Sequence, residues 1–264
     1  MTAIAGVNSP DKIALVEQML EKMNHRGDEW SGIHKENESI VGMSGNGIQE
    51  RSMDILQETG VAQDCTTGGR NVRVAATKSG LTITRDQIGL APLYYGWTNE
   101  NELCFASEVK GLLLATTDIH ELPPGCTFDG EHLEPYFSLK IQEPIDNPPE
   151  EIARELRRRL EGAVKECLDF GKTGSWLSGG LDSSAIAAIA SQYCKRIETF
   201  AVGLPDAPDL LYARQMAEHI HSNHHEIIVK PEEIIRVLPD VIYYLESFDA
   251  LLVRSSIFNY LVAQ

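Results

Sequence analysis

The segment from Ser178 to Ser184 constrains the fold more than any other part of this chain. It reads Ser-Gly-Gly-Leu-Asp-Ser-Ser and lies between a predicted strand over residues 174–177 and a helical pattern that begins at Ser183. Adjacent glycines let a backbone turn tightly and approach a ligand closely. The free N–H groups at the start of the next helix favour an anion at the same point. A strand, this loop and a helix together predict a site for a phosphate or pyrophosphate group.

The side chains of this segment fit such a site. Ser178, Ser183 and Ser184 add hydroxyl donors, and Mg²⁺ that bridges phosphate oxygens and one carboxylate would explain Asp182. The segment lacks the Lys of the Gly-x-x-x-x-Gly-Lys-[Ser/Thr] loop and does not match Gly-x-Gly-x-x-Gly. The purely structural alternative is a glycine-rich turn in which Ser183 is the helix N-cap.

Strands and helices alternate along the second half of the chain. The predicted elements are a helix over 152–167, a strand over 174–177, a helix over 183–193, a strand over 199–202, a helix over 210–220, a strand over 226–229 and a helix from Pro231, with Pro239 as a kink or break. This alternation is typical of βαβ units around a parallel sheet in an α/β, Rossmann-like domain. The chain ends at Gln264 within an apolar helical pattern, so we expect this domain to be incomplete at its C-terminus; a compact domain that ends on a helix is the alternative.

The first half has the pattern of a separate α+β domain. Ser9 and Pro10 predict a helix start, as N-cap and first helical residue. Two pairs of short runs predict antiparallel hairpins, 72–74 with 81–84 and 93–95 with 103–105, and Asp129-Gly130 predicts a further tight turn. The polar, proline-rich stretch 142–150 predicts a linker. We therefore expect one domain at residues 1–143 and another at 150–264.

Charge and cysteine usage exclude several classes of partner. With 23 Lys and Arg against 39 Asp and Glu, the formal net charge is −16. A surface so acidic repels phosphate backbones and anionic lipids, so neither nucleic acid nor membrane is an expected partner. The five cysteines are odd in number and widely spaced, which favours a reducing, cytoplasmic location over a disulfide framework or a zinc site. No apolar run is long enough to span a bilayer, and the N-terminus lacks the pattern of a signal peptide.

Further motifs occur in order along nearly the whole chain. They are residues 25–27 (His-Arg-Gly), 31–32 (Ser-Gly), 85–89 (Arg-Asp-Gln-Ile-Gly), 92–95 (Pro-Leu-Tyr-Tyr), 105–110 (Phe-Ala-Ser-Glu-Val-Lys), 123–125 (Pro-Pro-Gly), 200–205 (Phe-Ala-Val-Gly-Leu-Pro), 208–210 (Pro-Asp-Leu), 224–226 (His-His-Glu), 241–249 and 254–256 (Arg-Ser-Ser). Together with the segment Ser178–Ser184, which is similar to the pyrophosphate loop of the N-type ATP pyrophosphatases, they resemble the family of glutamine-hydrolysing asparagine synthetases.

The resemblance implies a two-domain amide ligase. Its N-terminal domain would be a class II (type 2) glutamine amidotransferase of the Ntn-hydrolase fold, here shortened, which hydrolyses glutamine and sends ammonia through a tunnel. Its C-terminal ATP pyrophosphatase domain would activate aspartate as an acyl-adenylate with release of pyrophosphate. The implied cofactors are ATP and Mg²⁺, the implied substrates are aspartate and either ammonia or glutamine, and a homodimer is an allowed assembly.

The resemblance also assigns roles to individual residues. The pyrophosphate would lie on the loop of Ser178, Gly179, Gly180, Ser183 and Ser184, with Asp182 serving Mg²⁺. Backbone of Trp176 or Leu177 and of Val202 would hold adenine. Arg254 would take part in the activation of aspartate, and an Arg beside two Ser also suits a carboxylate or phosphate by its chemistry. A surface ion pair is the alternative for Arg254.

The sequence departs from the family pattern at the glutaminase site. The family nucleophile is a Cys at position two, and this chain has Thr2. A Thr activated by its own α-amine is a known nucleophile, but a thiol is more reactive near neutral pH, so a vestigial N-terminus in a structural domain is the favoured interpretation. The chain between His25 and Arg85 looks short for the family, and no Arg that would hold the glutamine carboxylate is evident. Asn46-Gly47 is either an oxyanion-hole pair or, as we favour, a hairpin turn.

Other features leave alternatives open. The family's second loop, Ser-Gly-Glu-Gly-x-Asp, is absent, so we expect this chain alone not to close the site. Another amide ligase on the same scaffold, as in β-lactam synthetases, and a non-enzymatic ATP-binding remnant both fit the motifs. Four histidines lie close together in the sequence, at positions 219, 221, 224 and 225. They could form a metal site; the favoured interpretation is that the His224-His225 pair belongs to an ordinary strand. Residues 112–114 (Leu-Leu-Leu) are expected in the core.

Overall fold

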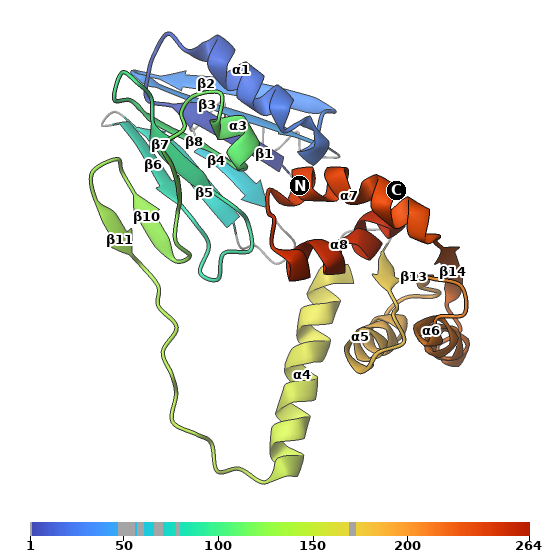
Figure 1. Ribbon diagram of the computed structural model, residues 1–264. Helices are drawn as coiled ribbons and strands as arrows, with labels where there is room; N and C mark the ends of the chain where they lie inside the picture. The colour runs from blue at the N-terminus through green and yellow to red at the C-terminus, as the bar shows by residue number, and fades with distance from the viewer. Residues whose placement is uncertain (1, 47–55, 57–60, 66–70, 78–79, 169–172) are drawn as a thin grey trace. The chain divides into compact units, whose positions relative to one another are not determined.

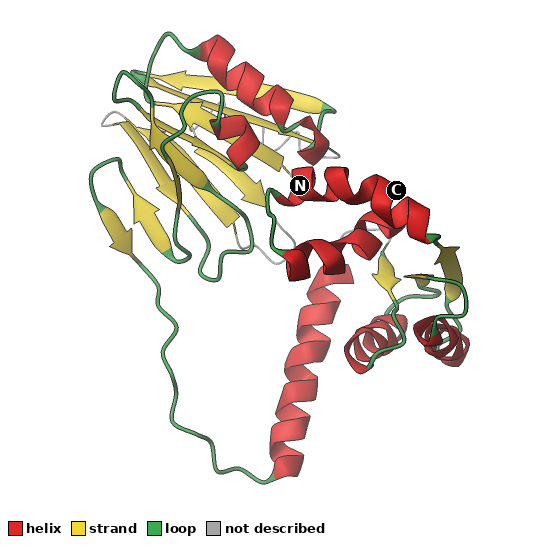
Figure 2. Cartoon of the chain, viewed as in Figure 1, coloured by secondary structure: helices red, strands yellow, loops and turns green. Residues whose placement is uncertain are grey.

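The structure of the chain is a computed structural model, which describes residues 2–46, 56, 61–65, 71–77, 80–168 and 173–264. The chain divides into two compact units, Met1–Glu143 and Pro144–Gln264 (Figures 1 and 2). Each unit is described by itself. Among the described residues, no helix is both long enough and apolar enough to cross a membrane.

Two antiparallel sheets form the body of the first unit. The first sheet has the order β2-β3-β1-β8-β7-β9 and the second the order β11-β10-β6-β5-β4. The strands are β1 (Thr2–Val7), β2 (Trp30–Glu36), β3 (Ser39–Gly45), β4 (Val61–Cys65), β5 (Asn71–Thr77), β6 (Gly80–Thr84), β7 (Tyr94–Trp97), β8 (Leu103–Ala106), β9 (Ile119–Glu121), β10 (Cys126–Phe128) and β11 (Leu133–Pro135). The helices are α1 (Ile13–Lys22), the 3-10 turn η1 (Asn24–Arg26) and α3 (Val109–Leu112).

The residues of β1 alternate between two cores. Ile4 packs with β3, β5, β6 and β8 residues between the two sheets, including Val41, Val74 and Phe105. Ala3, Ala5 and Val7 face the opposite way and pack against α1 and α3. Successive side chains of a strand point to opposite faces of its sheet. Both faces of this sheet are covered at β1, so the side chains of β1 are apolar on both faces. The described part of this unit is thus a helix layer and two sheet layers.

The hairpins predicted from the sequence are confirmed. Strands β5 and β6 pair antiparallel, as do β7 and β8. The turn at Asp129-Gly130 joins β10 to β11; the Asp129 carboxylate accepts hydrogen bonds from two backbone amides and Gly130 has φ of 102°. Of the Asn46-Gly47 pair, Gly47 lies outside the described residues.

Two local predictions in this unit are wrong. Helix α1 begins at Ile13 rather than at Ser9-Pro10. Ser9 is buried and bonds to the Glu102 carboxylate, which also pairs with Lys12, so tertiary contacts hold this segment outside the helix. In the run of three leucines only Leu112 is buried, while Leu113 and Leu114 are 53% and 46% exposed, because the single turn of α3 presents one face to the core.

The second unit contains the predicted parallel sheet. Its strands β12 (Gly174–Trp176), β13 (Glu198–Gly203) and β14 (Asn223–Ile228) lie in that order, and both pairings are parallel. The helices are α4 (Pro149–Leu168), α5 (Leu181–Ser191), α6 (Pro208–His219), α7 (Pro231–Leu245) and α8 (Ala250–Ala263). The predicted break at Pro239 does not occur, because α7 continues through it. The predicted linker has no helix or strand until α4 begins at Pro149.

Helices cover the two faces of this sheet differently. Ala201 of β13 packs with Ala187 of α5 and Leu210 of α6, which lie side by side (Figure 1). Helix α8 lies against β13 and brings Phe258 beside the opposite-facing Phe200 and Val202. Because consecutive strands of one parallel sheet open their carboxyl ends at one edge, this arrangement places the loop after β12 and the loop after β13 together.

Candidate functional site

The loop between β12 and α5 has a conformation that only glycine fits. Gly179 has φ of +78°, and a Cβ there would lie 2.6 Å from the backbone nitrogen of Ala213 and 2.6 Å from Cβ of Tyr212. A side chain is thus excluded both by backbone conformation and by α6. Gly180 is the N-cap of α5 with extended φ and ψ, and a Cβ there would meet only Ser178 Oγ, at 3.4 Å. The predicted tight turn and close approach are therefore present.

Two serine hydroxyls define the shape of this loop. Ser178 Oγ and Ser183 Oγ are 2.9 Å apart, and the backbone amide of Ser178 donates to Ser183 Oγ. The amide of Gly180 donates weakly to Ser178 Oγ at 3.4 Å. These contacts fold the loop back over the first turn of α5. Ser184 follows within the helix, where its amide bonds to the Gly180 carbonyl.

The start of α5 has the properties of an anion site. The first amides of a helix lack partners within the helix and carry the positive end of its dipole. Leu181 is 85% exposed and Asp182 is also exposed, so this end of the helix faces open space. A carboxylate at this position is free to hold a cation beside a bound anion. A glycine backbone open on one side, free amides and one carboxylate together fit a magnesium-bound pyrophosphate group.

A pocket of about 310 Å³ lies beside this loop, at the carboxyl ends of β12 and β13. Trp176, Leu177 and Ser178 line it from the first strand and its loop, and Val202 lines it from the second. Four residues that the sequence predicted at a nucleotide site thus line one pocket: Trp176, Leu177, Ser178 and Val202. Gly179, Gly180, Asp182, Ser183 and Ser184 continue from its edge into the loop and α5.

Sequence reasoning missed several residues that line this pocket. They are Phe200, Ala201, Gly203, Leu204, Ala207, Asp209, Phe258, Asn259 and Val262. Trp176, Phe200 and Phe258 give it aromatic walls, and Trp176 is 50% exposed. Flat apolar walls with a few polar groups are typical of a site for a nucleobase. The sequence gives one signal that α8 could line the pocket: residues Arg254, Phe258 and Val262 are spaced by four and therefore lie on one face of a helix.

Arg254 lies one turn before Phe258 on α8 and is exposed. Its position on the face that carries Phe258 and Val262 puts it beyond the end of the pocket rather than in its lining. The N-terminus of α8 is capped by Asp249, whose carboxylate accepts from the Leu252 amide at 2.8 Å. This cap fixes the first turn, from which Arg254 projects.

Thr2 lies at the other predicted site, in the first unit. It begins β1, opposite Gly45 of β3, and its side chain is fully buried. Arg26 Nε donates to the Thr2 carbonyl oxygen at 2.9 Å. Trp30 covers Gly45, since a Cβ on Gly45 would lie 2.4 Å from the indole and 3.0 Å from Thr2 Cγ2.

A buried group of charged residues supports the Arg26 side chain. Glu108 Oε1 lies 3.3 Å from Arg26 Nη1 and 3.0 Å from His25 Nε2, and Glu108 Oε2 lies 2.7 Å from Lys110 Nζ. Burial alone would raise the pKa of Glu108, but the hydrogen bonds from His25 and Lys110 and the Lys110 charge outweigh it and lower the pKa to about 2. Glu108 is therefore ionised at neutral pH and holds the residues that anchor Thr2.

The expected glutaminase groups are not assembled among the described residues around Thr2. Asn46 follows β3, and its side-chain oxygen accepts from the amides of Asp28 and Glu29 at 2.8 and 3.3 Å. The Arg26 side chain donates to the Thr2 carbonyl and to Glu108. Arg85 is buried and donates to Ala91 O, Leu122 O and the Glu121 carboxylate. Neither arginine is available as a clamp for a glutamine carboxylate.

The histidines near β14 do not converge. His224 Nδ1 lies 2.9 Å from Thr199 Oγ1, and His225 Nε2 lies 2.6 Å from Glu198 Oε2 on the opposite face of the sheet. Burial lowers the pKa of His224. Among the residues that the structure describes, no three His, Cys, Asp or Glu side chains form a group that could hold a metal ion.

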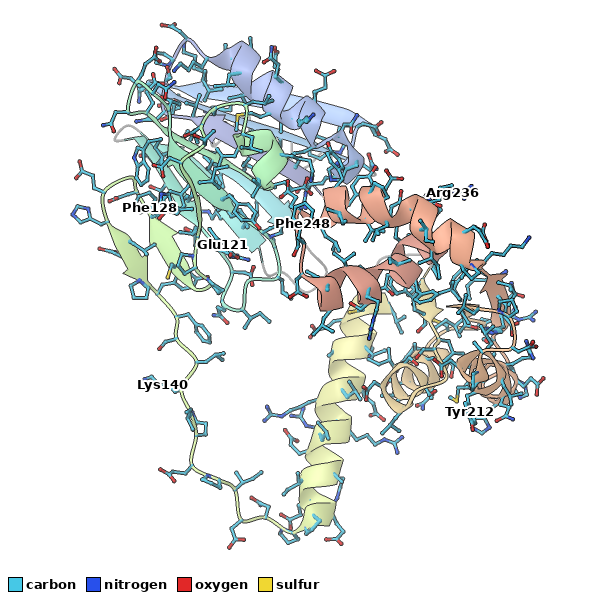
Figure 3. All side chains as sticks on the ribbon, viewed as in Figure 1. Glu121, Phe128, Lys140, Tyr212, Arg236 and Phe248 are labelled. Carbon is cyan, nitrogen blue, oxygen red and sulfur yellow. The ribbon has the colours of Figure 1, made fainter. Side chains whose placement is uncertain are left out.

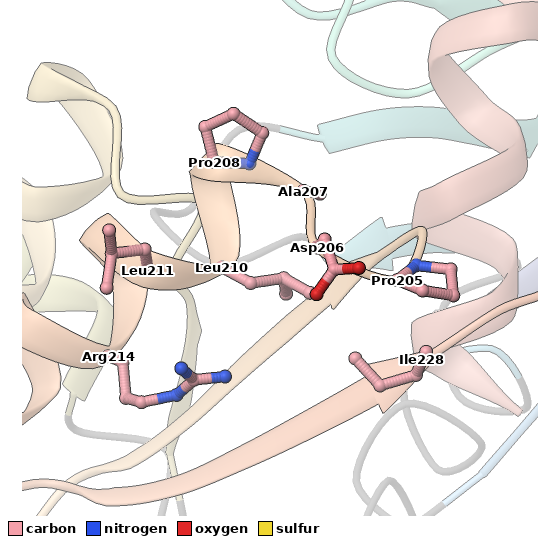
Figure 4. A pocket seen from close by; sticks show the side chains of 8 residues that line it. All are labelled: Pro205, Asp206, Ala207, Pro208, Leu210, Leu211, Arg214 and Ile228. Carbon is pink, nitrogen blue, oxygen red and sulfur yellow. The ribbon is translucent and has the colours of Figure 1, made fainter.

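A second surface pocket lies between the first turns of α6, the loop before it and the end of β14. It is lined by Asp206, Leu211, Arg214 and Ile228, among others (Figure 4). Arg214 is engaged there by Glu226 through two contacts of 2.7 Å, which also lower the pKa of Glu226. Among the described residues that line this pocket, the only guanidinium is that of Arg214, which is already paired with Glu226, so the pocket has fewer free groups for a charged ligand than the one at β12 and β13.

Two family models match the chain. The asparagine synthase model matches residues 155–264, and the glutamine amidotransferase domain model matches residues 72–168, which begins after Thr2. A solved structure titled glutamine phosphoribosylpyrophosphate amidotransferase from B. subtilis aligns with 89% of this chain and 70% of its own at 12% identity, but its TM-score of 0.38 supports no argument.

Similar curated proteins are asparagine synthetases described as glutamine-hydrolysing. Asparagine synthetase B of Escherichia coli K12 is 36% identical over 207 residues, which are 71% of this chain and 37% of that protein. The probable enzyme of Schizosaccharomyces pombe is 34% identical over 71% of this chain and 38% of its own, and that of Gallus gallus is 32% identical over 69% and 38%. The chain thus spans well under half the length of these relatives. The motifs, both family models and these relatives agree: the chain belongs to the family of glutamine-hydrolysing asparagine synthetases.

Proposed function

We propose that this chain carries the ATP-activating site of an asparagine synthetase-type carbon–nitrogen ligase. The ligase joins a carboxylate oxygen of aspartate to the α-phosphorus of ATP and releases pyrophosphate. Ammonia then attacks the acyl carbon of the adenylate, so that the C–N bond of the amide forms, the bond to the adenylate oxygen breaks and AMP leaves. The observation that carries this proposal is the aromatic pocket beside the Gly179 loop, at the carboxyl ends of two parallel strands. Ligands of open α/β sheets bind at that edge.

The loop residues would hold the phosphates. The amides at the start of α5 and the hydroxyls of Ser178, Ser183 and Ser184 suit a pyrophosphate group. Mg²⁺, when bound, would neutralise phosphate charge, and the carboxylate of Asp182 in the first turn of α5 would hold it. A side chain on Gly179 would displace α6, and this explains why the loop is glycine there.

The pocket would hold adenine, and Arg254 the carboxylate substrate. Trp176, Phe200 and Phe258 offer apolar faces, and the backbone around Leu177 and Val202 offers hydrogen-bonding groups at the strand ends. A guanidinium recognises a carboxylate by paired hydrogen bonds, so Arg254 would orient aspartate toward the α-phosphate. Arg254 is one helical turn from Phe258, a suitable separation for an adjoining substrate.

The first unit would contribute little glutaminase activity. Hydrolysis of glutamine needs a nucleophile, an oxyanion hole and a clamp for the α-carboxylate. Thr2 replaces the thiol, and Arg26 and Arg85, two of the described arginines of this unit, have other partners. We therefore propose free ammonia as the nitrogen source, with the glutaminase-type domain retained for structural reasons.

Titration calorimetry of the chain with pyrophosphate and with ATP, each with and without Mg²⁺, tests the proposal. We expect Asp182→Ala to abolish the gain in affinity that Mg²⁺ provides. The matched control is Asp206→Ala, since Asp206 is also an exposed acidic residue but lies in the loop before α6 and lines the other pocket. Equal effects of the two substitutions would contradict the assignment of Asp182.

The alternatives inferred from the sequence predict other results. Nucleotide binding without turnover of any acid would favour a non-enzymatic remnant. Turnover with a carboxylate other than aspartate would favour a different amide ligase on this scaffold.

A further inference from the structure

Asp209 lies where the glycine loop meets the aromatic pocket. It belongs to the first turn of α6 and lines the pocket together with Ser178 and Phe258. Its carbonyl oxygen is one of the atoms that exclude a side chain at Gly179, at 2.8 Å from the position of a Cβ. Asp209 is therefore a neighbour of both the expected phosphate subsite and the expected base subsite.

The Asp209 carboxylate has no structural task that the described residues reveal. Asp86, Asp129 and Asp249 each accept hydrogen bonds from backbone amides. Asp209 caps nothing, because the N-cap of α6 is Ala207 and no side chain accepts a hydrogen bond there. Within the described part of the chain the Asp209 side chain makes no hydrogen bond or ion pair, and it is exposed. Its acceptor oxygens are free for a ligand.

The chemistry of a nucleotide decides what such a carboxylate can bind. A nucleotide that places its base against Trp176 and its phosphates on the Gly179 loop must place its ribose between them. Ribose offers two vicinal hydroxyl donors, and an ionised carboxylate accepts such hydrogen bonds strongly. Phosphate oxygens, in contrast, repel it. We propose that Asp209 is the specificity-determining residue for ribose and accepts hydrogen bonds from the 2′- and 3′-hydroxyls; this inference rests on the proposed nucleotide site.

Two other roles make different predictions. If Asp209 only complements the dipole of α6, its removal lowers stability and leaves nucleotide binding unchanged. If it holds Mg²⁺ instead, its removal weakens ATP and deoxy-ATP equally and only in the presence of Mg²⁺. Only the ribose role couples the side chain to individual sugar hydroxyls.

The test measures dissociation constants for ATP, 2′-deoxy-ATP and 3′-deoxy-ATP by calorimetry, with Mg²⁺ present and absent. We expect the chain to prefer ATP over at least one of the deoxy compounds by about tenfold, the effect of losing one hydrogen bond to a charged group. In Asp209→Ala this preference should fall below about twofold, because ATP binding weakens and deoxy-ATP binding does not. Asp209→Asn, which keeps one acceptor, should retain part of the preference.

Asp206→Ala is the matched control, and we expect it to keep the full preference. Thermal unfolding of each variant shows whether the fold is intact. An unchanged preference in Asp209→Ala, or equal weakening of all three nucleotides, would overturn the inference while leaving the nucleotide site in place. Absence of binding by all three nucleotides to the native chain would instead contradict the proposed function itself.

Discussion

Gly179 and Tyr212 approach so closely that a Cβ on Gly179 would lie 2.6 Å from Cβ of Tyr212. Tyr212, which is labelled in Figure 3, belongs to α6. The residue is 56% exposed, so the contact holds the backbone of the loop against the helix and does not bury the tyrosine. The position of α6 thus constrains the conformation of the Gly179 loop.

This contact predicts the effect of Gly179→Ala. Positive φ and a clash with backbone atoms cannot be relieved by a side-chain rotation, so the free energy of unfolding should fall by about 2 kcal/mol or more. The measurement is urea unfolding followed by circular dichroism. Gly162→Ala is the control in the same unit: a Cβ there meets nothing within 4 Å in the middle of α4, so it should stabilise the chain by about 0.5–1 kcal/mol. A Gly179→Ala variant as stable as the native chain would show that α6 can move away.

The buried Glu108 group predicts a pH dependence of stability. Its pKa is about 2 in the folded chain against an ordinary 4.5, so it contributes stability fully above pH 4.5 and loses it as the pH falls toward 2. The side chain is 9% exposed, and the contribution at neutral pH is about 2–3 kcal/mol. The free energy of unfolding of Glu108→Gln should therefore lie below that of the native chain at pH 7 and approach it as the pH falls from 4.5 to 2.

Glu155 provides the control for this experiment. Hydrogen bonds from Arg158 and Arg159 lower the pKa of Glu155 to about 2 as well, but the group is fully exposed on α4. We expect Glu155→Gln to change stability little at any pH, because solvent screens exposed pairs. Equal pH profiles for the two variants would contradict the role of burial at Glu108.

The sequence predicted the tight glycine turn between β12 and α5 well, because its signal is local. Paired glycines between a strand and a helix require the backbone that Gly179 adopts. The pocket walls could not be predicted in the same way. Asp209 and Phe258 lie about 30 and 80 residues after the loop, and only the order of the parallel strands and the packing of α8 bring them together.

Local signals also failed where tertiary contacts opposed them. Ser9-Pro10 is a good helix start, but the hydrogen bond between Ser9 and Glu102 removes Ser9 from the helix. Pro239 would break an isolated helix, yet α7 continues through it with Val237 and Val241 packed against α8. Burial of such an apolar face offsets a lost backbone hydrogen bond.

The surroundings of Thr2 predict the outcome of a glutaminase assay. Loss of one oxyanion-hole donor alone costs ~10²–10³ in rate, and this site also has a hydroxyl in place of a thiol. We expect no measurable glutamate release from glutamine by the native chain. Thr2→Cys alone should not restore it, since a thiol replaces only the nucleophile and supplies neither an oxyanion hole nor a clamp for the glutamine carboxylate. Glutamate release that Thr2→Ala abolishes would show that Thr2 is a nucleophile and that this prediction is wrong.

The position of Arg254 leads to a prediction about aspartate-dependent exchange of pyrophosphate into ATP. Adenylation is reversible, so a protein that contains this chain and activates aspartate should exchange labelled pyrophosphate into ATP when aspartate is present; the variants below are compared in such a protein. We expect Arg254→Ala to reduce aspartate-dependent exchange at least about tenfold while ATP binding stays within about twofold, because the residue lies one turn beyond the pocket lining. Arg254→Lys should recover only part of the exchange, since an ammonium cannot form the paired hydrogen bonds of a guanidinium.

Arg236→Ala is the control: Arg236 is an exposed arginine on α7 (Figure 3) that lines neither of the two pockets of this unit described above. Exchange that requires another acid in place of aspartate would assign Arg254 to a different substrate, and equal losses in the Arg254 and Arg236 variants would remove Arg254 from the site.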